Sequence, residues 1–268
     1  MDLESESLDQ PNVSRLRERL VVTDIARRLF DKVVCLARRE RLLSSDHFTV
    51  DGTLIEAWAS FKSFKRKDGE PPKDGGVGTG MVDFKGEKRS NATHQSTTDP
   101  ESKLTREGNG QSAKLSYGGH ALMENRNSLC ADILVPDSTQ AEHCAARTLL
   151  TRARRRRIHP TTRGADKGYH VKEFVSHLRE HQIRPHIARI ANRNTPGLDG
   201  RTTRTEAYRI SQKKRKRVEE IFGWLKTVGR MRKTRLIGEA KTQMAAFISG
   251  VAYNRLSIAK LSNSRAGA

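Results

Sequence analysis

The chain has 268 residues and carries 51 Lys and Arg against 31 Asp and Glu, which gives a formal net charge of +20. A charge this large indicates a polyanionic partner, and nucleic acid is the first candidate. Hydrophobic residues make up only 35% of the chain and aromatic residues 5%. This composition predicts a thin core, with one packed domain and additional segments that stay unpacked.

The same composition excludes several classes of protein. The three cysteines are widely spaced, which excludes a disulfide framework or a CxxC metal site and is typical of a reducing cytoplasm. No apolar run approaches the roughly 20 residues that span a membrane. The first twelve residues, MDLESESLDQPN, are polar and acidic, which predicts disorder and not a signal peptide.

The N-terminal part of the chain predicts a helical region followed by a strand. Residues 13–43 have apolar side chains at helical spacing, and Thr23-Asp24 offers an N-cap before the clearest run. His47-Phe-Thr-Val-Asp51 then reads as a short strand that ends in a turn at Gly52. Residues 60–114 are rich in Gly, Lys, Ser, Thr and Pro and have no sustained apolar period, so we expect a long, mostly irregular insertion.

Regular structure is predicted again from Lys114 onward. Residues 115–123 and 129–135 read as two strands joined by the turn Asn125–Ser128, which predicts an antiparallel hairpin. The segments that follow read as a helix over 140–156 capped by Thr139, a strand before Asp166, a helix over 171–181, a strand over 184–188, a loop over 189–209, and helices over 212–227 and 241–261. This order predicts an α/β fold with a mixed sheet covered by helices.

Three carboxylates are candidates for chemistry because of their positions. Asp51 and Asp166 each end a predicted strand, where ligands gather in α/β sheets, and Glu219 lies in the predicted helix over 212–227. Carboxylates are hard oxygen ligands that suit Mg²⁺ or Mn²⁺, and two such ions serve phosphoryl transfer. The spacing of Arg215, Glu219 and Lys226 puts all three on one helix face, which places Glu219 between two cations.

A simpler interpretation of these residues stays open at this point. An aspartate before a glycine or at a strand end is commonly a turn residue, and an Arg–Glu pair four residues apart is commonly surface decoration. Glu220 lies about 100° round the helix from Glu219 and is expected to be solvated or paired with Lys216.

Several motifs together resemble the DDE transposases of bacterial insertion sequences. They are HFTVDGTLIEAWAS, KLSYGGHALMENRN, GADKGY, LDGRTTR and SQKKRKRVEEIFGWLKTV, in that order along the chain. The chain is most similar to insertion-sequence family five, within the broader family-four-like class, and the resemblance runs from about Asp24 to Leu261.

The resemblance implies an RNase H-like fold and a DNA transposase that cleaves and joins strands with two Mg²⁺ or Mn²⁺ ions. Asp51 matches the first Asp of the metal-binding triad, Asp166 the second, and Glu219 the Glu, which decides between Glu219 and Glu220. Arg215 and Lys226 match the family's Tyr-x2-Arg-x3-Glu-x6-Lys signature, whereas Gln212 stands at its Tyr position.

The resemblance also divides the chain. Residues 1–46 are expected to be a helical remnant with a disordered start. Residues 47–59 and 115–235 would form the catalytic domain, interrupted by the flexible insertion over 60–114, and residues 236–268 a C-terminal helix and polar tail. The family has a larger helical region before its first strand, so we expect this chain to be truncated at its N-terminus. The alternative function is therefore a truncated DNA-binding remnant that does not transpose.

The expected partner is DNA, both the ends of the element and the target, bound by a homo-oligomer in the bacterial cytoplasm at the nucleoid. Basic runs are the candidates for contacts with the DNA backbone, although a run of charge is commonly just a solvated surface. The residues predicted to bind DNA are Arg155, Arg156, Lys213, Lys214, Arg215, Arg217 and Lys226.

Overall fold

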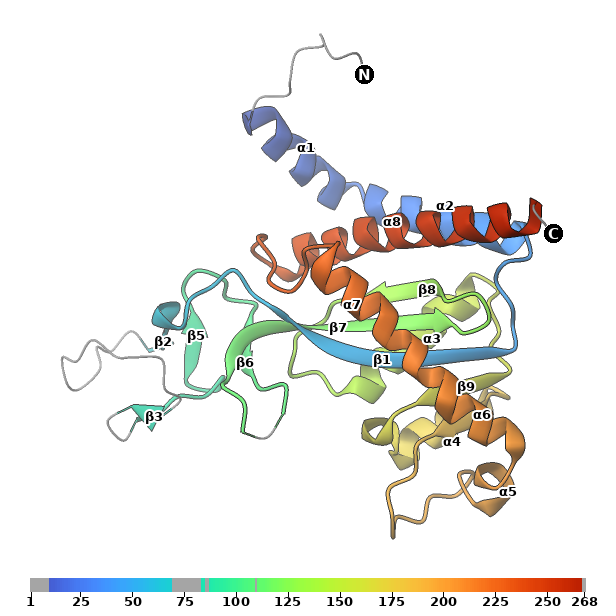
Figure 1. Cartoon of the computed structure of the whole chain (residues 1–268). Helices are drawn as coiled ribbons and strands as arrows, with labels where there is room; N and C mark the ends of the chain where they lie inside the picture. The colour runs from blue at the N-terminus through green and yellow to red at the C-terminus, as the bar shows by residue number, and fades with distance from the viewer. Residues whose placement is uncertain (1–9, 69–82, 85–86, 109, 267–268) are drawn as a thin grey trace.

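The computed structural model describes residues 10–68, 83–84, 87–108 and 110–266, and a single main sheet with helices on both faces organises them (Figure 1). The sheet has six strands in the order β10-β9-β1-β7-β6, and β8 also pairs with β7. In chain order the strands are β1 (His47–Glu56), β6 (Lys103–Thr105), β7 (Lys114–Glu124), β8 (Leu129–Leu134), β9 (Thr162–Ala165) and β10 (Arg184–Ile187).

The sheet is mixed in direction. Strand β7 runs antiparallel to β1, β6 and β8, whereas β9 runs parallel to both β1 and β10. The predicted hairpin is confirmed as β7 and β8, with the turn residue Ser128 in the left-handed region at φ 54°. A mixed sheet flanked by helices is consistent with an RNase H-like fold, so the predicted fold class is confirmed.

Helices cover the sheet on two faces and along one edge. They are α1 (Gln10–Val22), α2 (Ile25–Arg39), α3 (Glu142–Arg155), α4 (Lys172–Glu180), α5 (Gly200–Thr203), α6 (Glu206–Lys214), α7 (Val218–Thr227) and α8 (Glu239–Ala266). In Figure 1, α7 crosses in front of β1 and α3 lies behind the sheet, while α2 and α8 run side by side next to β8. Among the described residues, no helix is both long and apolar enough to cross a membrane.

The core lies where the helices meet the central strands. Every residue of β8 is buried, and so is every residue of β7 after Lys114. From the helices, Phe30 of α2, Phe247 of α8 and Leu149 of α3 join one continuous apolar cluster with these strands. The thin apolar composition is therefore concentrated in the sheet and in one face of each covering helix.

Three helix boundaries differ from the sequence-based prediction. The region 13–43 is two helices, because Asp24 adopts the left-handed conformation at φ 51° and its side chain caps nothing. Thr139 does not cap α3; its hydroxyl donates to Asp137, and the helix begins after Ala141 without a side-chain cap. The helix expected from residue 212 begins at Glu206, where Thr205 caps it.

The predicted helix over 212–227 is also interrupted. A 3-10 turn over Arg215–Arg217 separates α6 from α7. Arg215 and Glu219 therefore do not lie on one continuous α-helical face, and the spacing argument that put them together was wrong in its geometry.

The described part of the expected insertion contains more structure than its composition indicates. Strand β2 (Phe64–Arg66) pairs with β5 (His94–Ser96), β3 (Asp83–Phe84) pairs with β4 (Glu87–Lys88), and β6 adds an edge strand to the main sheet. The Tyr117 hydroxyl donates to the Asp99 carboxylate at 2.6 Å, both residues being fully buried. Backbone pairing and polar contacts create this order. A search for apolar residues at regular spacing therefore does not detect it.

Residues 69–82, 85–86 and 109 lie outside the described residues, and the predicted domain boundaries stay a prediction.

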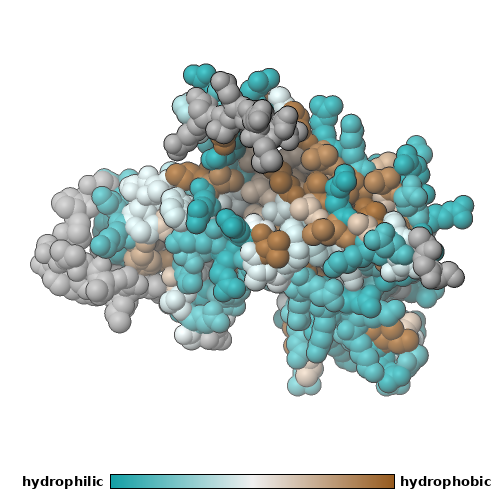
Figure 2. Space-filling view, turned by 45° about the horizontal axis from the view of Figure 1, so that its top comes forward, coloured by the Kyte–Doolittle hydropathy of each residue, from teal (hydrophilic) through white to brown (hydrophobic). Residues whose placement is uncertain are grey.

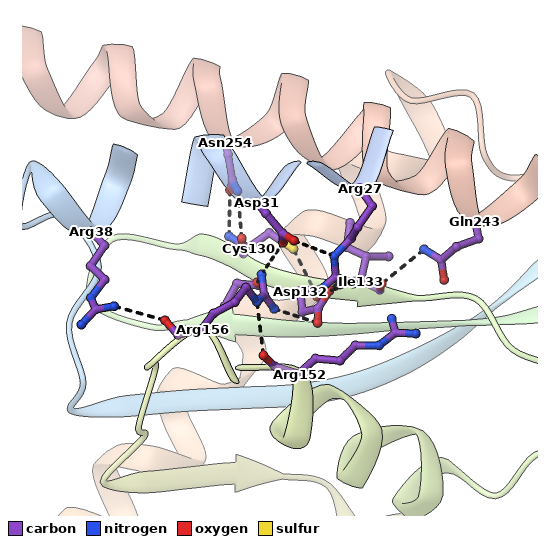
Figure 3. A network of polar contacts seen from close by, with 11 residues as sticks. Arg27, Asp31, Arg38, Cys130, Asp132, Ile133, Arg152, Arg156, Gln243 and Asn254 are labelled. Carbon is purple, nitrogen blue, oxygen red and sulfur yellow. Dashed lines mark hydrogen bonds and ion pairs between the residues drawn. The ribbon is translucent and has the colours of Figure 1, made fainter. Parts of the chain in front are cut away.

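A buried ionic network ties the N-terminal helices to the sheet (Figure 3). The Asp132 carboxylate of β8 has no exposed surface and forms ion pairs with Arg156 at 2.7 Å and Arg27 at 3.4 Å. Asp31 of α2 pairs with the same two arginines, at 3.0 Å each. Arg156 also donates to the Ala131 carbonyl at 2.9 Å, so the end of α3, helix α2 and strand β8 are held at one point.

We predict that Asp132→Asn lowers the free energy of unfolding by about 3 kcal/mol, because two largely buried guanidinium groups lose a counter-charge. Urea denaturation of both proteins measures this difference. Glu40→Gln is the matched control, since Arg39 and Glu40 form an exposed pair whose loss should cost less than about 0.5 kcal/mol. Equal stabilities for Asp132→Asn and the wild type would show that the network does not hold the fold.

Candidate active site

Asp51 and Asp166 are brought together by the parallel pairing of β1 and β9. The paired residues run from His47 with Thr162 to Thr49 with Gly164. Asp51 and Asp166 each lie two residues beyond the last of these pairs, on neighbouring strands that run in the same direction. Asp166 directly follows the last residue of β9, as expected, but Asp51 lies in the middle of β1, which continues through Gly52 to Glu56 instead of ending in the predicted turn. The parallel pairing of the two strands nevertheless places the two carboxylates side by side.

Each aspartate accepts a backbone hydrogen bond with one of its carboxylate oxygens. Oδ1 of Asp51 accepts a hydrogen bond from the Gly52 amide at 2.9 Å. Oδ1 of Asp166 accepts from the Gly168 amide at 2.6 Å and caps the 3-10 turn over Lys167–Tyr169. The turn-residue interpretation is thus correct for Asp166 and wrong for Asp51, which lies within β1. The second oxygen of each carboxylate has no hydrogen bond within the described part of the chain.

Glu219 reaches the same place from the first turn of α7, which crosses β1. Its charge, like that of Asp166, raises the pKa of Asp51, whereas Arg215 acts in the opposite direction. The charges of Asp166 and Glu219 therefore both act on Asp51, with Arg215 as a nearby cation.

Burial and crowding together shift the ionisation of Asp51. Burial is the largest cause and raises the pKa of Asp51 from its ordinary 3.8 to about 6, although the Gly52 amide works against it. The charges of Asp166 and Glu219 add to the increase. A bound cation, like a proton, would relieve the repulsion among these carboxylates.

The sequence reasoning missed a fourth carboxylate, that of Glu142 in the first turn of α3. An ideal Cβ on Gly168 would lie 2.7 Å from Oε2 of Glu142, and one on Gly52 would lie 3.6 Å from Oε1. Burial raises the pKa of Glu142, and the charges of Asp166 and Asp51 raise it further. A glutamate at the start of a helix has an ordinary explanation in the helix dipole, so its position in the sequence carried no signal.

The site carboxylates are more widely spread than the ligands of a single ion. Within the described residues, His177, Glu180 and His181 are the one group of three such side chains whose ligand atoms all lie within 4.8 Å of one another. That group lies at the end of α4, and Arg147 is among the charges that lower the pKa of His177 after burial and His181. Two metal ions lie ~3.5–4 Å apart in phosphoryl-transfer sites, so ligands for a pair of ions need a wider spread than ligands for one.

The predicted DNA-binding residues divide into two groups in the structure. Lys213 and Lys214 are exposed at the end of α6, next to the turn that leads to Glu219. Arg217 donates to the backbone carbonyls of Asn125 and Arg126, and Lys226 pairs with Glu107 at 3.2 Å. These side chains surround the segment that presents Glu219, although Lys226 is engaged by a partner that the sequence did not indicate.

Arg155 and Arg156 lie at the other end of α3 from Glu142. At 1.5 Å per residue they are about 20 Å away along the helix. Arg155 is exposed there, but Arg156 is committed to Asp132 and Asp31. The structure thus assigns Arg156 to the buried network instead of to a DNA surface, because Asp132 is a buried counter-charge that sequence spacing does not reveal.

Comparisons with known proteins agree with this arrangement. The family described as "Transposase DDE domain" matches residues 45–255, which is most of the chain. A protein of Neisseria meningitidis serogroup B, described as "Transposase for insertion sequence element IS1106", is 35% identical over 99 residues. The match covers 37% of this chain and 33% of that protein, so the chain spans about a third of the length of this relative.

The raised pKa of Asp51 predicts how stability depends on pH in metal-free buffer. A carboxyl that holds its proton more tightly in the folded state loses stability when it ionises. Below about pH 4 the wild type and Asp51→Asn should be equally stable. Between about pH 4 and pH 6 the free energy of unfolding of the wild type should fall progressively relative to that of Asp51→Asn. Above about pH 6 the wild type should remain less stable by at most about 3 kcal/mol. Urea denaturation at pH 4, 5, 6 and 7 measures this difference.

Asp199→Asn is the control with the opposite sign. The hydrogen bond from Arg201 holds the pKa of Asp199 below its ordinary value. Asp199→Asn should therefore not be more stable than the wild type at any pH between 4 and 7. A stability difference between Asp51→Asn and the wild type that stays constant from pH 4 to pH 7 would contradict the electrostatic description of the site.

Proposed function

Because this chain belongs to the family of transposase DDE domains, we propose that it is a DNA strand transferase of an insertion sequence, dependent on Mg²⁺ or Mn²⁺. The observation that supports the proposal is the parallel pairing of β1 and β9, which brings Asp51 and Asp166 side by side, while the charge of Glu219 on α7 acts on Asp51. The substrates are the ends of the element and a target DNA.

The residues of the site fit the divalent metal that the family uses. Asp51, Asp166 and Glu219 offer hard carboxylate oxygens, the ligands that Mg²⁺ and Mn²⁺ prefer. The second oxygen of each aspartate is left for a cation by the local hydrogen bonds. Bound there, two ions would supply a nucleophilic oxygen and neutralise the leaving oxygen in phosphoryl transfer.

The residues around the metal site support binding of the DNA backbone. Lys213 and Lys214 are exposed immediately before the turn that contains Arg215, whose charge reaches Asp51. Cations at these positions would hold a phosphate next to the carboxylates, and Arg217 and Lys226 would extend the same surface. Arg155 would contact backbone only at a distance from the reaction, since it lies at the far end of α3.

The proposed reaction consists of two displacements at phosphorus. Water attacks a phosphodiester at the end of the element and displaces the 3′ oxygen, which takes a proton and leaves a free 3′-hydroxyl. That hydroxyl then attacks a phosphodiester of the target in line and displaces a target 3′ oxygen. The chain's contribution is to position both strands and to place negative charge where cations are needed, which supplies much of the rate in such reactions.

We also propose that the chain associates with copies of itself. Figure 2 shows hydrophobic residues gathered in its upper half, over α2 and α8, above a mostly hydrophilic lower part. The exposed large apolar side chains of α1, α2 and α8 are Val13, Leu16, Val22, Ile25, Leu29, Ile248 and Leu256. A patch of this kind supports a contact between copies of the chain that are bound to the two ends of one element.

We predict that Asp51→Asn retains DNA binding and loses Mg²⁺-dependent nicking. Asparagine keeps the shape of the side chain but removes the charge that holds a divalent ion. A filter-binding titration with salt and a nicking assay on supercoiled plasmid measure the two properties. Asp199→Asn, at an exposed pair with Arg201, should leave both unchanged.

Binding itself should weaken steeply with salt. Each of Lys213→Ala and Lys214→Ala should reduce the slope of log affinity against log salt by about 1, because one phosphate contact is lost. Equal nicking by wild type and Asp51→Asn would remove Asp51 from the mechanism. Absence of nicking by either protein, with salt-sensitive binding intact, would favour a DNA-binding protein without strand transfer.

A further inference from the structure

The two glycines that follow the catalytic aspartates both face the carboxylate of Glu142. Gly52 comes directly after Asp51, and Gly168 comes two residues after Asp166. A methyl group on Gly168 would lie 2.7 Å from Oε2, which is closer than side chains approach one another, and a methyl group on Gly52 would be in contact with Oε1. Neither glycine has a positive φ, so room beside Glu142, and not backbone conformation, distinguishes glycine from alanine at Gly168.

Gly52 also leaves room for a buried histidine. An ideal Cβ there would lie 2.8 Å from the ring of His120, which is 4% exposed. The Nδ1 atom of His120 has no hydrogen-bond partner in the described structure. His120 and Glu142 therefore both lie next to the α-carbon of Gly52, where a larger residue would contact them.

Tyr169 provides an independent indication that something binds at this point. The residue is fully buried, and its hydroxyl has no hydrogen-bond partner in the part of the chain that the structure describes. After burial, the charges that raise the pKa of Tyr169 are those of Glu142, Asp51 and Asp166, in decreasing order. A buried, unpartnered hydroxyl beside three carboxylates is suited to a bound ion with its water.

No ion pair or hydrogen bond in the described structure explains why the Glu142 side chain points toward the two aspartates. Within the described residues it forms neither an ion pair nor a hydrogen bond, and it does not cap α3, which begins after Ala141 without a side-chain cap. Arg215 is the cation whose charge bears on Asp51, in a chain with 51 Lys and Arg. In the described structure, no cation is among the charges that shift the pKa of Glu142, which are those of Asp166 and Asp51.

We propose that Glu142 is a fourth carboxylate ligand of the proposed two-ion site, beside Asp51, Asp166 and Glu219. The inference rests on the proposed function, since it extends the same metal site. In this arrangement α3 supplies a ligand from one face of the sheet and α7 supplies Glu219 from the other. The site is therefore a carboxylate tetrad, and Gly168 is glycine because the Glu142 carboxylate occupies the space of a side chain.

The test is the affinity of the full chain for Mn²⁺, measured by titration calorimetry and by the electron paramagnetic resonance signal of free Mn²⁺. Glu142→Gln should raise the dissociation constant about tenfold or more, as expected for loss of a charged ligand. Glu173→Gln is the matched control. Glu173 is also in the first turn of a helix, α4, and is not among the charges that shift the pKa of Asp51 or Glu142. The Glu173→Gln variant should bind Mn²⁺ with the affinity of the wild type.

Gly168→Ala tests the geometry without removing a charge. The added methyl should displace the Glu142 carboxylate and weaken Mn²⁺ binding, and the same change in a Glu142→Gln background should have little further effect. A full additional loss in that background would mean that Gly168 acts through Asp166 alone, and would contradict the inference.

The outcomes separate this inference from the proposed function. If Asp51→Asn weakens Mn²⁺ binding and Glu142→Gln binds as the wild type does, the tetrad is overturned and the proposed metal site remains. If Asp51→Asn also binds Mn²⁺ with unchanged affinity, both are overturned. Loss in both variants with an unchanged Glu173→Gln supports the tetrad.

Discussion

The crowding of negative charge where two parallel strands pair is the constraint on which the rest of this structure depends. Once β1 and β9 pair in parallel, Asp51 and Asp166 must lie next to each other, and burial makes the ionisation of Asp51 costly. A half-buried carboxylate with carboxylate neighbours is destabilising unless a cation compensates it. The chain is rich in Lys and Arg, and Arg215 is the cation among the largest influences on the pKa of Asp51.

The contrast with Asp132 shows how differently the same fold treats two buried aspartates. Asp132 forms ion pairs with Arg27 and Arg156, whose charges lower its pKa against the larger effect of burial, which raises it. Helix α3 connects the two places. Arg156, just beyond its C-terminal end, is fixed in this ion-pair network, and Glu142 at its N-terminal end lies among the carboxylates of the site, about 20 Å away. A stable ion network thus anchors the helix that reaches the site.

The sequence indicates the strands that carry Asp51 and Asp166, but it does not indicate the full extent of these strands or the contacts made by neighbouring helices. Asp166 follows β9 as expected, whereas Asp51 lies within β1, because pairing with β7 continues the strand through Gly52 to Glu56. The hairpin of β7 and β8 has a clear turn at Asn125–Ser128. Glu142 could not be found, because an acid in the first turn of a helix is ordinary and its contact with Gly168 exists only in three dimensions. Arg156 was assigned to DNA for a related reason: its run of arginines suggests a surface, and only tertiary structure shows the buried Asp132. Strand β6 was missed because backbone pairing with β7, and not apolar burial, creates it.

Anomalous diffraction from crystals of the full chain grown with Mn²⁺ tests the central claim most directly, because it locates the ion without reference to activity. The carboxylate site predicts a manganese peak between Asp51 and Asp166, within ligand distance of Glu219 or Glu142. The competing position is the group of His177, Glu180 and His181 on α4, which is the tightest cluster of potential ligands in the described structure. Manganese found there alone, with none between Asp51 and Asp166, would contradict the account.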